Sequence, residues 1–301
     1  MTWPGFLDLA DVAALQANAI LLPLPFEGTV SFGRGTAAAP EAVWRASTQI
    51  ELWDEELEFD LSSLAYHTAP VLVAGDGETP ESYQQRVFEQ SRFYSPMSGL
   101  VIGVGGEHGL TPALVRAAAD DPDDLSDVTV VQFDAHADLR DSYNGSPWSH
   151  ACAMRRLVER GAKVVAVGIR SADREESAYG RESGRVETFP ARRLVGPDRK
   201  AQAELLDLLE SLSGAVYLTV DVDVFEISLC PATGTPQPGG LDWWTTMRFL
   251  RRLLHENRQI NLIGCDVVET VPQPGTHVNE TVAAALIAKM VAYRFASPDL
   301  Q

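Results

Sequence analysis

Apolar and polar positions follow two different patterns along the chain, and segments with the two patterns alternate. Short runs of β-branched and other apolar residues occupy 18–24, 70–75, 98–106, 127–134, 162–169, 214–221 and 260–268. Apolar residues at three- and four-residue spacing fill 111–119, 149–161, 199–212 and 242–257. The first pattern is typical of buried strands and the second of amphipathic helices. Strands that are apolar on both faces and joined by helices indicate an α/β fold, with a mostly parallel sheet covered on both sides.

Two Pro- and Gly-rich segments, 23–40 and 230–240, each follow a predicted strand. Parallel sheets of this kind bind ligands beyond the carboxyl ends of their strands, where such loops lie. We therefore interpret both segments as site loops and not as linkers. Because the composition shows no internal break, residues 1–301 are expected to form a single domain.

The composition is that of a folded chain, with 45 % apolar and 22 % charged residues. The 42 acidic and 24 basic residues give a formal net charge of -18. Such a charge repels phosphate backbones and anionic membrane surfaces, so no nucleic acid or membrane partner is expected. It also attracts a small cationic substrate, although acidity serves solubility alone in many proteins.

Cysteine usage and the N-terminal sequence bear on the compartment. Cys152, Cys230 and Cys265 are odd in number and widely spaced, which does not indicate a disulfide framework. The first residues lack the basic segment and apolar run of a signal peptide, and no later stretch approaches about 20 consecutive apolar residues. We expect a cytoplasmic protein.

Two acidic residues and a histidine lie at the end of the apolar run at 127–134 and just after it. Asp134, His136 and Asp138 are two residues apart, and extended residues at that spacing point the same way. Two carboxylates and an imidazole at one strand end form a partial coordination shell for a divalent ion. In isolation, the segment is also compatible with an acidic strand end that has a turn-forming Asp and a surface His.

Two further strand ends carry side chains of the same kinds. Asp221 and Asp223 follow a later strand, again two residues apart, and Glu107 and His108 follow an earlier one. A dinucleotide-binding loop is the rival interpretation of this earlier, Gly-rich turn. It is disfavoured because His108 stands where the fingerprint requires its last glycine.

Four Asp and two His from three strand ends are too many donors for one cation. They suit two adjacent cations that share bridging carboxylates, so we expect a dinuclear site. Oxygen-rich ligation with a minority of imidazoles and no thiolate favours Mn²⁺ over a structural zinc. Fe²⁺, Co²⁺ and Ni²⁺ stay open as alternatives.

Several segments, in the same order along the chain, resemble the arginase/agmatinase family of ureohydrolases. They are GGEH (105–108), FDAHAD (133–138), SHACAMRR (149–156), TVDVDVFE (219–226), CPATGTPQPGG (230–240) and DVVETVP (266–272). An opening loop and helix at 23–47 extend the resemblance over nearly the whole chain. The resemblance implies a three-layer α/β/α fold on an eight-stranded parallel sheet, two Mn²⁺ ions and a homo-oligomer, either trimer or hexamer.

The resemblance also implies a set of metal ligands. They are the bridging carboxylates Asp134 and Asp221, then His108 and Asp138 at one ion, and His136 and Asp223 at the other. Glu107 stands where the family motif more often has Asp. As the neighbour of a ligand, it is expected to support the metal shell and not to bind metal itself.

Two further residues match family positions that contact the substrate. His150 matches a histidine near the leaving amine, which implies a proton shuttle, and its alternative is a His at a helix start that is bonded to backbone. Glu269 matches the carboxylate that grips the guanidinium through a bidentate pair, and its alternative is a solvated acid beside a proline turn. Asp266 is interpreted as a structural residue of the same strand end.

The expected reaction is hydrolysis of the guanidinium group of agmatine to urea and putrescine by a metal-bridging hydroxide. Glu269 would orient the guanidinium, and Asp138 and then His150 would deliver a proton to the departing amine. A metal-dependent deacylase with a similar sheet and a non-catalytic metal-binding homologue are the alternatives from other classes.

Substrate choice is expected to depend on the loop 139–151. This loop lacks the Ser/Asn-rich pattern with which arginases hold an α-carboxylate and α-amine, and it resembles agmatinases. Agmatine is therefore the first choice, and N1-aminopropylagmatine is close behind. Guanidinobutyrate or arginine would need a cation for the carboxylate, and Arg140 is the residue that could supply it.

Overall fold

Strands and helices alternate along most of the chain in the computed structural model, which describes residues 3–197 and 199–297. The strands are β1 (Ala19–Leu24), β2 (Trp53–Asp54), β3 (Phe59–Asp60), β4 (Tyr66–Thr68), β5 (Leu100–Gly105), β6 (Val128–Phe133), β7 (Lys163–Ile169), β8 (Val186–Pro190), β9 (Gly214–Asp221) and β10 (Ile260–Val268). The α-helices are α1 (Ala39–Ser47), α2 (Pro80–Tyr94), α3 (Thr111–Ala118), α4 (Ala153–Val158), α5 (Arg174–Ser183), α6 (Ala191–Leu194), α7 (Lys200–Ser211), α8 (Trp243–Arg251) and α9 (Val278–Phe295). Short helical turns that matter for the site are η5 (His108–Leu110), η6 (His150–Cys152) and η7 (Val222–Val224).

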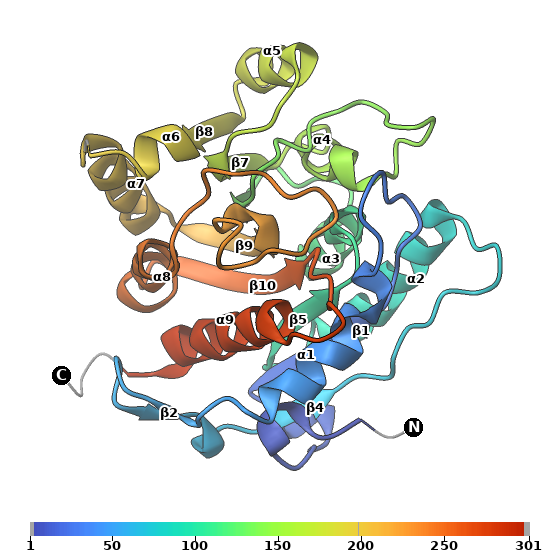
Figure 1. Ribbon diagram of the computed structural model, residues 1–301, viewed down its shortest axis with the longest axis vertical. Coiled ribbons are helices and arrows are strands. Elements are labelled where there is room, and N and C mark those ends of the chain that lie inside the picture. Colours follow the sequence, from blue (N-terminus) through green and yellow to red (C-terminus); the bar gives the residue numbers. More distant parts are fainter. Residues whose placement is uncertain (1–2, 198, 298–301) are drawn as a thin grey trace.

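Most of the strands form one eight-stranded sheet, in which neighbouring strands run parallel (Figure 1). Their order is β4-β1-β5-β10-β9-β6-β7-β8, and β2 pairs separately with β3. A tight hairpin cannot join two strands that run in the same direction, so longer crossovers, most of them helical, connect them. The expected eight-stranded parallel sheet is confirmed.

Alternate residues of the buried strands pack on opposite faces of the sheet. In β1, Leu21 joins the core that contains Trp44 of α1, whereas Ile20 and Leu22 join the core that contains Tyr83 of α2. On the first face α1 lies against α9, and on the second α2 lies against α3 (Figure 1). Both faces are buried, which is why consecutive strand positions are apolar. The three-layer α/β/α fold expected from the sequence is confirmed.

The strands at the two edges of the sheet were not predicted correctly from the sequence. Six of the seven apolar runs coincide with strands, but the run at 70–75 is not a strand, and that prediction is wrong. Val71 and Val73 are 38 % and 63 % exposed, and Pro70 lacks the N–H that a strand ladder uses. The edge strand is β4, just before this run. At the other edge, β8 has exposed polar residues at its centre and no apolar run, so the pattern did not reveal it.

Two features bear on the cellular surroundings of the protein. Cys152, Cys230 and Cys265 are buried and free. Within residues 3–197 and 199–297, no helix has the length and apolar character needed to cross a membrane. The cytoplasmic location stays a prediction.

The end of β5 and the loop that follows β1 approach each other closely. The backbone N–H of Gly106 donates to Leu24 O at 3.1 Å, and that of Glu107 donates to Phe26 O at 3.1 Å. A Cβ at Gly106 would lie 2.2 Å from Phe26 O, a backbone atom that cannot move unless the loop moves. The two segments can therefore meet only because residue 106 has no side chain.

Gly106→Ala is expected to lower the free energy of unfolding by about 1–3 kcal/mol, the usual range for overpacking a tight site. Gly75→Ala is the matched control, because a Cβ there would meet no atom closer than 3.7 Å. The control should change the free energy of unfolding by less than about 0.5 kcal/mol. Urea denaturation of both variants and the parent measures the difference, and equal stabilities of the two variants would contradict this account of the contact.

Candidate metal centre and active site

The predicted site residues meet at the carboxyl edge of the four central strands. β5, β10, β9 and β6 are adjacent in the sheet. His108 follows β5, Glu269 follows β10, Asp221 ends β9 and Asp134 follows β6. Because parallel strands end at the same edge, residues that are 161 positions apart in the chain become hydrogen-bonded neighbours.

One group of donors surrounds Nδ1 of His108. This nitrogen lies 3.0 Å from Asp134 Oδ2 and 3.0 Å from Asp138 Oδ2. It also lies 3.7 Å from Asp221 Oδ2. All four residues are buried. His108, Asp134 and Asp138 are close enough together that they could hold a metal ion.

A second group forms around His136 and shares Asp134 with the first. His136 Nδ1 lies 2.8 Å from Asp223 Oδ2 and 3.7 Å from Asp134 Oδ1. The other oxygen of Asp223 accepts the backbone N–H of Ala135 at 2.8 Å. Asp221 accepts the backbone N–H of Asp223 through Oδ1 at 2.8 Å, so its Oδ2 is the oxygen near the first group. The two groups therefore meet at Asp134, and Asp221 lies beside them.

Asp134, His136 and Asp138 reach the site by a route that differs from the extended strand suggested by their spacing. β6 ends at Phe133, and after an irregular stretch His136 pairs again, with Ser171, in an isolated parallel bridge. Asp138 has a φ of 53°, in the left-handed region that is unfavourable for a residue with a Cβ. His136 and Asp138 consequently belong to different donor groups. Backbone strain of this kind, on the order of 1–3 kcal/mol, is concentrated at functional sites.

Two neighbouring side chains, which the sequence did not single out as partners, fix the ring of His108. Its Nε2 lies 2.9 Å from Oγ1 of Thr219, and Thr219 donates its own proton to Asp266 at 2.5 Å. Nε2–H must therefore be the donor to Thr219, because a hydroxyl has only one proton. Nδ1 is then left without a hydrogen bond of good geometry among the residues that the structure describes. Asp266 also accepts hydrogen bonds from Thr111 and Tyr217, as a structural residue would.

The donor set fits divalent cations in charge as well as in position. Burial raises the pKa of Asp138 to about 7, and it raises the pKa of Asp221 well above its usual range, with neighbouring carboxylates adding to both shifts. Burial lowers the pKa of His108, but contacts with Asp134 and Asp138 outweigh this and raise that pKa well above its ordinary value. Crowded, buried carboxylates are stable as anions only beside positive charge. Carboxylate oxygens and imidazole nitrogens are ligands that suit such cations.

Glu269 lies beside the first donor group, immediately after β10. Its φ is 63°, so it is a second site residue in the left-handed region. Its Oε1 accepts the backbone N–H of His108 at 2.7 Å. Its Oε2 faces Gly234 in the loop 230–240, where an added Cβ would lie 3.0 Å from this oxygen. Burial raises the pKa of Glu269 to about 8. One oxygen is thus held by the backbone, and the other faces a predicted site loop.

His150 is the first residue of η6, a turn that the Ser149 side chain caps. Its ring Nδ1 lies 3.1 Å from the hydroxyl of Thr29 and 3.5 Å from the hydroxyl of Ser149. The ring meets Tyr143 edge-on, with centroids 6.0 Å apart. Burial, together with two nearby histidines, lowers the pKa of His150 to about 4, so the ring is neutral near pH 7.

Arg140 is held by acidic residues at the start of α5. Its Nη1 lies 2.6 Å from Asp173 Oδ2, and its Nη2 lies 3.5 Å from Glu176 Oε2. The guanidinium also lies over the ring of Tyr143, 5.0 Å from the centroid. Asp173 and Glu176 form the capping box of α5. Arg140 is therefore already paired, which weighs against its use as the cation for a substrate carboxylate.

Arg170 was not predicted, and it ties two site segments together. Its guanidinium donates to the carbonyl of Asp223 at 2.6 Å and to that of Gln237 at 2.7 Å. Its Nε donates to the carbonyl of Pro238 at 3.1 Å. A guanidinium has five donors in a rigid plane, so it can satisfy several carbonyls at once. Arg170 directly follows β7, and nothing in its local sequence distinguishes it from a surface arginine.

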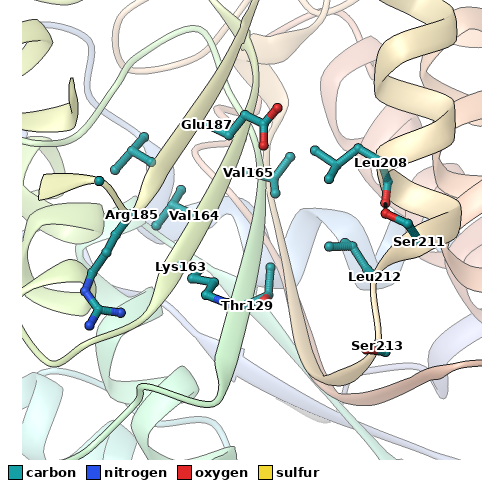
Figure 2. Close-up of a pocket in the computed structure, with 12 residues that line it drawn as sticks. Thr129, Lys163, Val164, Val165, Arg185, Glu187, Leu208, Ser211, Leu212 and Ser213 are labelled. Atoms are coloured by element: carbon teal, nitrogen blue, oxygen red, sulfur yellow. Dashed lines mark hydrogen bonds between the residues drawn. The ribbon is translucent and has the colours of Figure 1, made fainter.

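A cavity of about 600 Å³ lies at the opposite, amino edge of β6, β7 and β8 (Figure 2). Lys163, Arg185 and Glu187 are among its lining residues, and Leu208 and Leu212 line its other wall. None of the predicted site residues lines it. The site is therefore identified by the convergence of side chains that could hold metal ions and not by the volume of a cavity.

Comparisons with known proteins agree with this geometry. The model of the arginase family matches residues 17–293. An N(1)-aminopropylagmatine ureohydrolase of Synechocystis sp. is 34 % identical over 282 residues, covering 92 % of this chain and 89 % of that relative. An agmatinase of Pyrococcus horikoshii is 35 % identical over 269 residues, covering 87 % of each chain. The crystal structure of agmatine ureohydrolase of Thermoplasma volcanium matches with a TM-score of 0.81 at 26 % identity, covering 94 % of this chain and 92 % of that one.

The chain therefore belongs to the arginase family of ureohydrolases, and it is an enzyme of that family. The match begins before β1 and ends within α9, so it includes the site loops as well as the sheet. The family resemblance inferred from the sequence is confirmed. The two alternatives from other classes, a metal-dependent deacylase and a non-catalytic homologue, are therefore not favoured.

Arg170→Lys is expected to loosen the loop 230–240, because a lysine ammonium cannot span the same carbonyls as a guanidinium. Loss of one or two hydrogen bonds of about 1 kcal/mol each corresponds to roughly tenfold faster amide hydrogen exchange in this loop. Arg45→Lys is the control, because Arg45 is exposed and paired only with Glu41 among the ion pairs of the described residues. Parental exchange rates in Arg170→Lys would contradict the role given to Arg170.

Proposed function

We propose that this enzyme hydrolyses the guanidinium group of a small cationic amine with the help of two divalent metal ions. The observation that carries the proposal is the pair of three-residue donor groups that share Asp134. Relatives named agmatinase and N(1)-aminopropylagmatine ureohydrolase are 35 % and 34 % identical to the chain, which supports a guanidino substrate.

The proposed ligands come from both donor groups and from the carboxylate beside them. They are His108, Asp134, His136, Asp138, Asp221 and Asp223. Asp134 turns Oδ2 toward His108 and Oδ1 toward His136, which supports its assignment as a bridge. The oxygen-rich set with two imidazoles favours Mn²⁺. When bound, the two cations lower the pKa of a water molecule and so supply a nucleophile at neutral pH.

The reaction forms a bond from a water oxygen to the guanidinium carbon and breaks the bond from that carbon to the amine nitrogen. Both water hydrogens end on the departing nitrogen, so the products are urea and a protonated amine. Glu269 would orient the guanidinium through Oε2 and the remaining lone pair of Oε1, since Oε1 already accepts one N–H. Asp138 and then His150, which is neutral near pH 7, would carry a proton to the departing nitrogen.

Agmatine and N1-aminopropylagmatine are the substrates that fit best, because neither carries a carboxylate. The chain has a net charge of -18, and Arg140 is paired with Asp173 and Glu176. The carboxylate of guanidinobutyrate or arginine could therefore use Arg140 only by breaking these ion pairs. Hydrolysis of agmatine yields urea and putrescine, a step of polyamine biosynthesis.

Three properties inferred from the sequence stay predictions. They are the homo-oligomeric state, trimer or hexamer, the cytoplasmic location and the single domain over residues 1–301. Mn²⁺ is likewise a preference of the donor set.

Agmatine or N1-aminopropylagmatine should be hydrolysed with a kcat/KM about a thousandfold or more above that for arginine or guanidinobutyrate. The reason is that burying an unpaired carboxylate costs several kcal/mol. Urea release with Mn²⁺ measures all four substrates, in the parent and in Arg140→Ala. The variant should keep the ranking, since Arg140 is paired with residues of α5.

Comparable efficiencies on agmatine and arginine would contradict the proposed substrate class. A drop confined to carboxylated substrates in Arg140→Ala would assign Arg140 to binding a carboxylate. Absence of urea release from every guanidino compound would overturn the proposed function itself.

A further inference from the structure

The hydroxyl of Thr29 lies between a buried carboxylate and the imidazole of His150. Thr29 donates its backbone N–H to Glu107 Oε2 at 2.8 Å and its hydroxyl to Glu107 Oε1 at 2.9 Å. The same hydroxyl oxygen lies 3.1 Å from His150 Nδ1 and accepts the backbone N–H of His150 at 3.1 Å. Glu107 is fully buried. Thr29 is thus the direct link between Glu107 and His150.

The hydrogen-bonding capacity of a hydroxyl determines the direction of each bond. A hydroxyl has one proton and two acceptor sites. Both oxygens of Glu107 accept from Thr29, so the hydroxyl proton is committed to Glu107. The two acceptor sites then receive the backbone N–H and the Nδ1–H of His150. In the neutral ring, Nδ1 therefore carries the proton and Nε2 carries the lone pair.

Packing of the preceding residues holds Thr29 in this place. Phe26 stacks on Tyr83 of α2, with ring centroids 4.2 Å apart. A Cβ at Gly28 would lie 2.2 Å from the Phe26 ring, so the chain turns tightly over that ring. The backbone N–H of Glu107 donates to Phe26 O at 3.1 Å. The loop and the end of β5 therefore form one unit, which fixes the distance between Thr29 and Glu107.

We propose that Thr29 and Glu107 are positioning residues that hold His150 as its Nδ1–H tautomer, so that Nε2 is the atom that exchanges the proton. The kinetic consequence rests on the proposed function of His150 as proton carrier, whereas the tautomer can be observed without any activity. Without the Thr29 hydroxyl, Nδ1 loses this acceptor and keeps the Ser149 hydroxyl at 3.5 Å, which can also donate, so the ring can take the other tautomer. Nε2 would then already carry a proton when it must accept one.

Nitrogen-15 NMR of histidine-labelled full-length protein, with diamagnetic Mg²⁺ added, reads the tautomer directly. The chain has six histidines, and comparison with His150→Ala assigns the signals of His150. We expect a protonated Nδ1 in the parent and in Thr29→Ser. Thr29→Val keeps the shape without the hydroxyl and should lose this tautomer. An Nε2–H tautomer in the parent, or the parental tautomer in folded Thr29→Val, would overturn the inference.

Urea release from agmatine with Mn²⁺ gives a second readout. Thr29→Val should lower kcat by about 10- to 100-fold, the scale for a misplaced catalytic group, with KM and metal content unchanged. Thr29→Ser should retain most of the parental kcat. The double variant with His150→Ala should be no slower than His150→Ala alone, because Thr29 acts through His150. Fully additive losses would overturn the inference. A parent that released no urea would refute the proposed function, and the NMR result would then decide the inference.

Glu107→Gln covers the case in which Thr29→Val does not fold. The amide keeps the size of the side chain but has only one oxygen, so it cannot accept both bonds from Thr29 in the same way. We expect the same loss of the Nδ1–H tautomer and a lower kcat, with metal content unchanged. The parental tautomer in folded Glu107→Gln would count against the role given to Glu107.

Discussion

Buried carboxylates that share one small volume are the constraint on which the rest of this structure depends. Asp134, Asp138, Asp221 and Asp223 are each no more than 5 % exposed. Anions repel one another strongly in a low-dielectric interior, so they need positive charge nearby. Backbone N–H groups and two imidazoles neutralise part of this charge, and divalent cations would neutralise the remainder. The proposed chemistry follows from that requirement, since the same cations would activate water.

The parallel sheet makes this concentration of charge possible. Four adjacent strands end at one edge, and short connections carry the donors from there. The connections are strained, as the left-handed φ values of 53° at Asp138 and 63° at Glu269 show. Hydrogen bonds offset the strain: Glu269 accepts the backbone N–H of His108, Thr219 holds the ring of His108, and Arg170 holds the turn at Asp223. The residues that surround the donors therefore matter as much as the donors themselves.

The sequence predicted features that depend on neighbouring residues, and it did not predict contacts between residues that are far apart in the chain. Central strands were visible because burial on both faces makes them continuously apolar, and the donors were visible because they directly follow those strands. The hydrogen-bond partners of the site histidines could not be predicted, because Thr219 and His108 are 111 positions apart and Thr29 and His150 are 121 apart. The edges of the sheet were hard for a different reason: an edge strand is half-exposed, so β8 shows no apolar run, whereas 70–75 shows one without being a strand. Left-handed backbone at Asp138 likewise has no mark in the sequence.

Metal stoichiometry tests most directly whether these donors hold two ions that share Asp134. Equilibrium dialysis against Mn²⁺ followed by elemental analysis should give two ions per chain for the parent. Asp120→Asn, which changes an exposed carboxylate outside the site, should also bind two. Asp134→Asn should bind one ion or none, because a neutral amide replaces the shared carboxylate. One ion or none in the parent, or two ions in Asp134→Asn, would contradict the proposed dinuclear site.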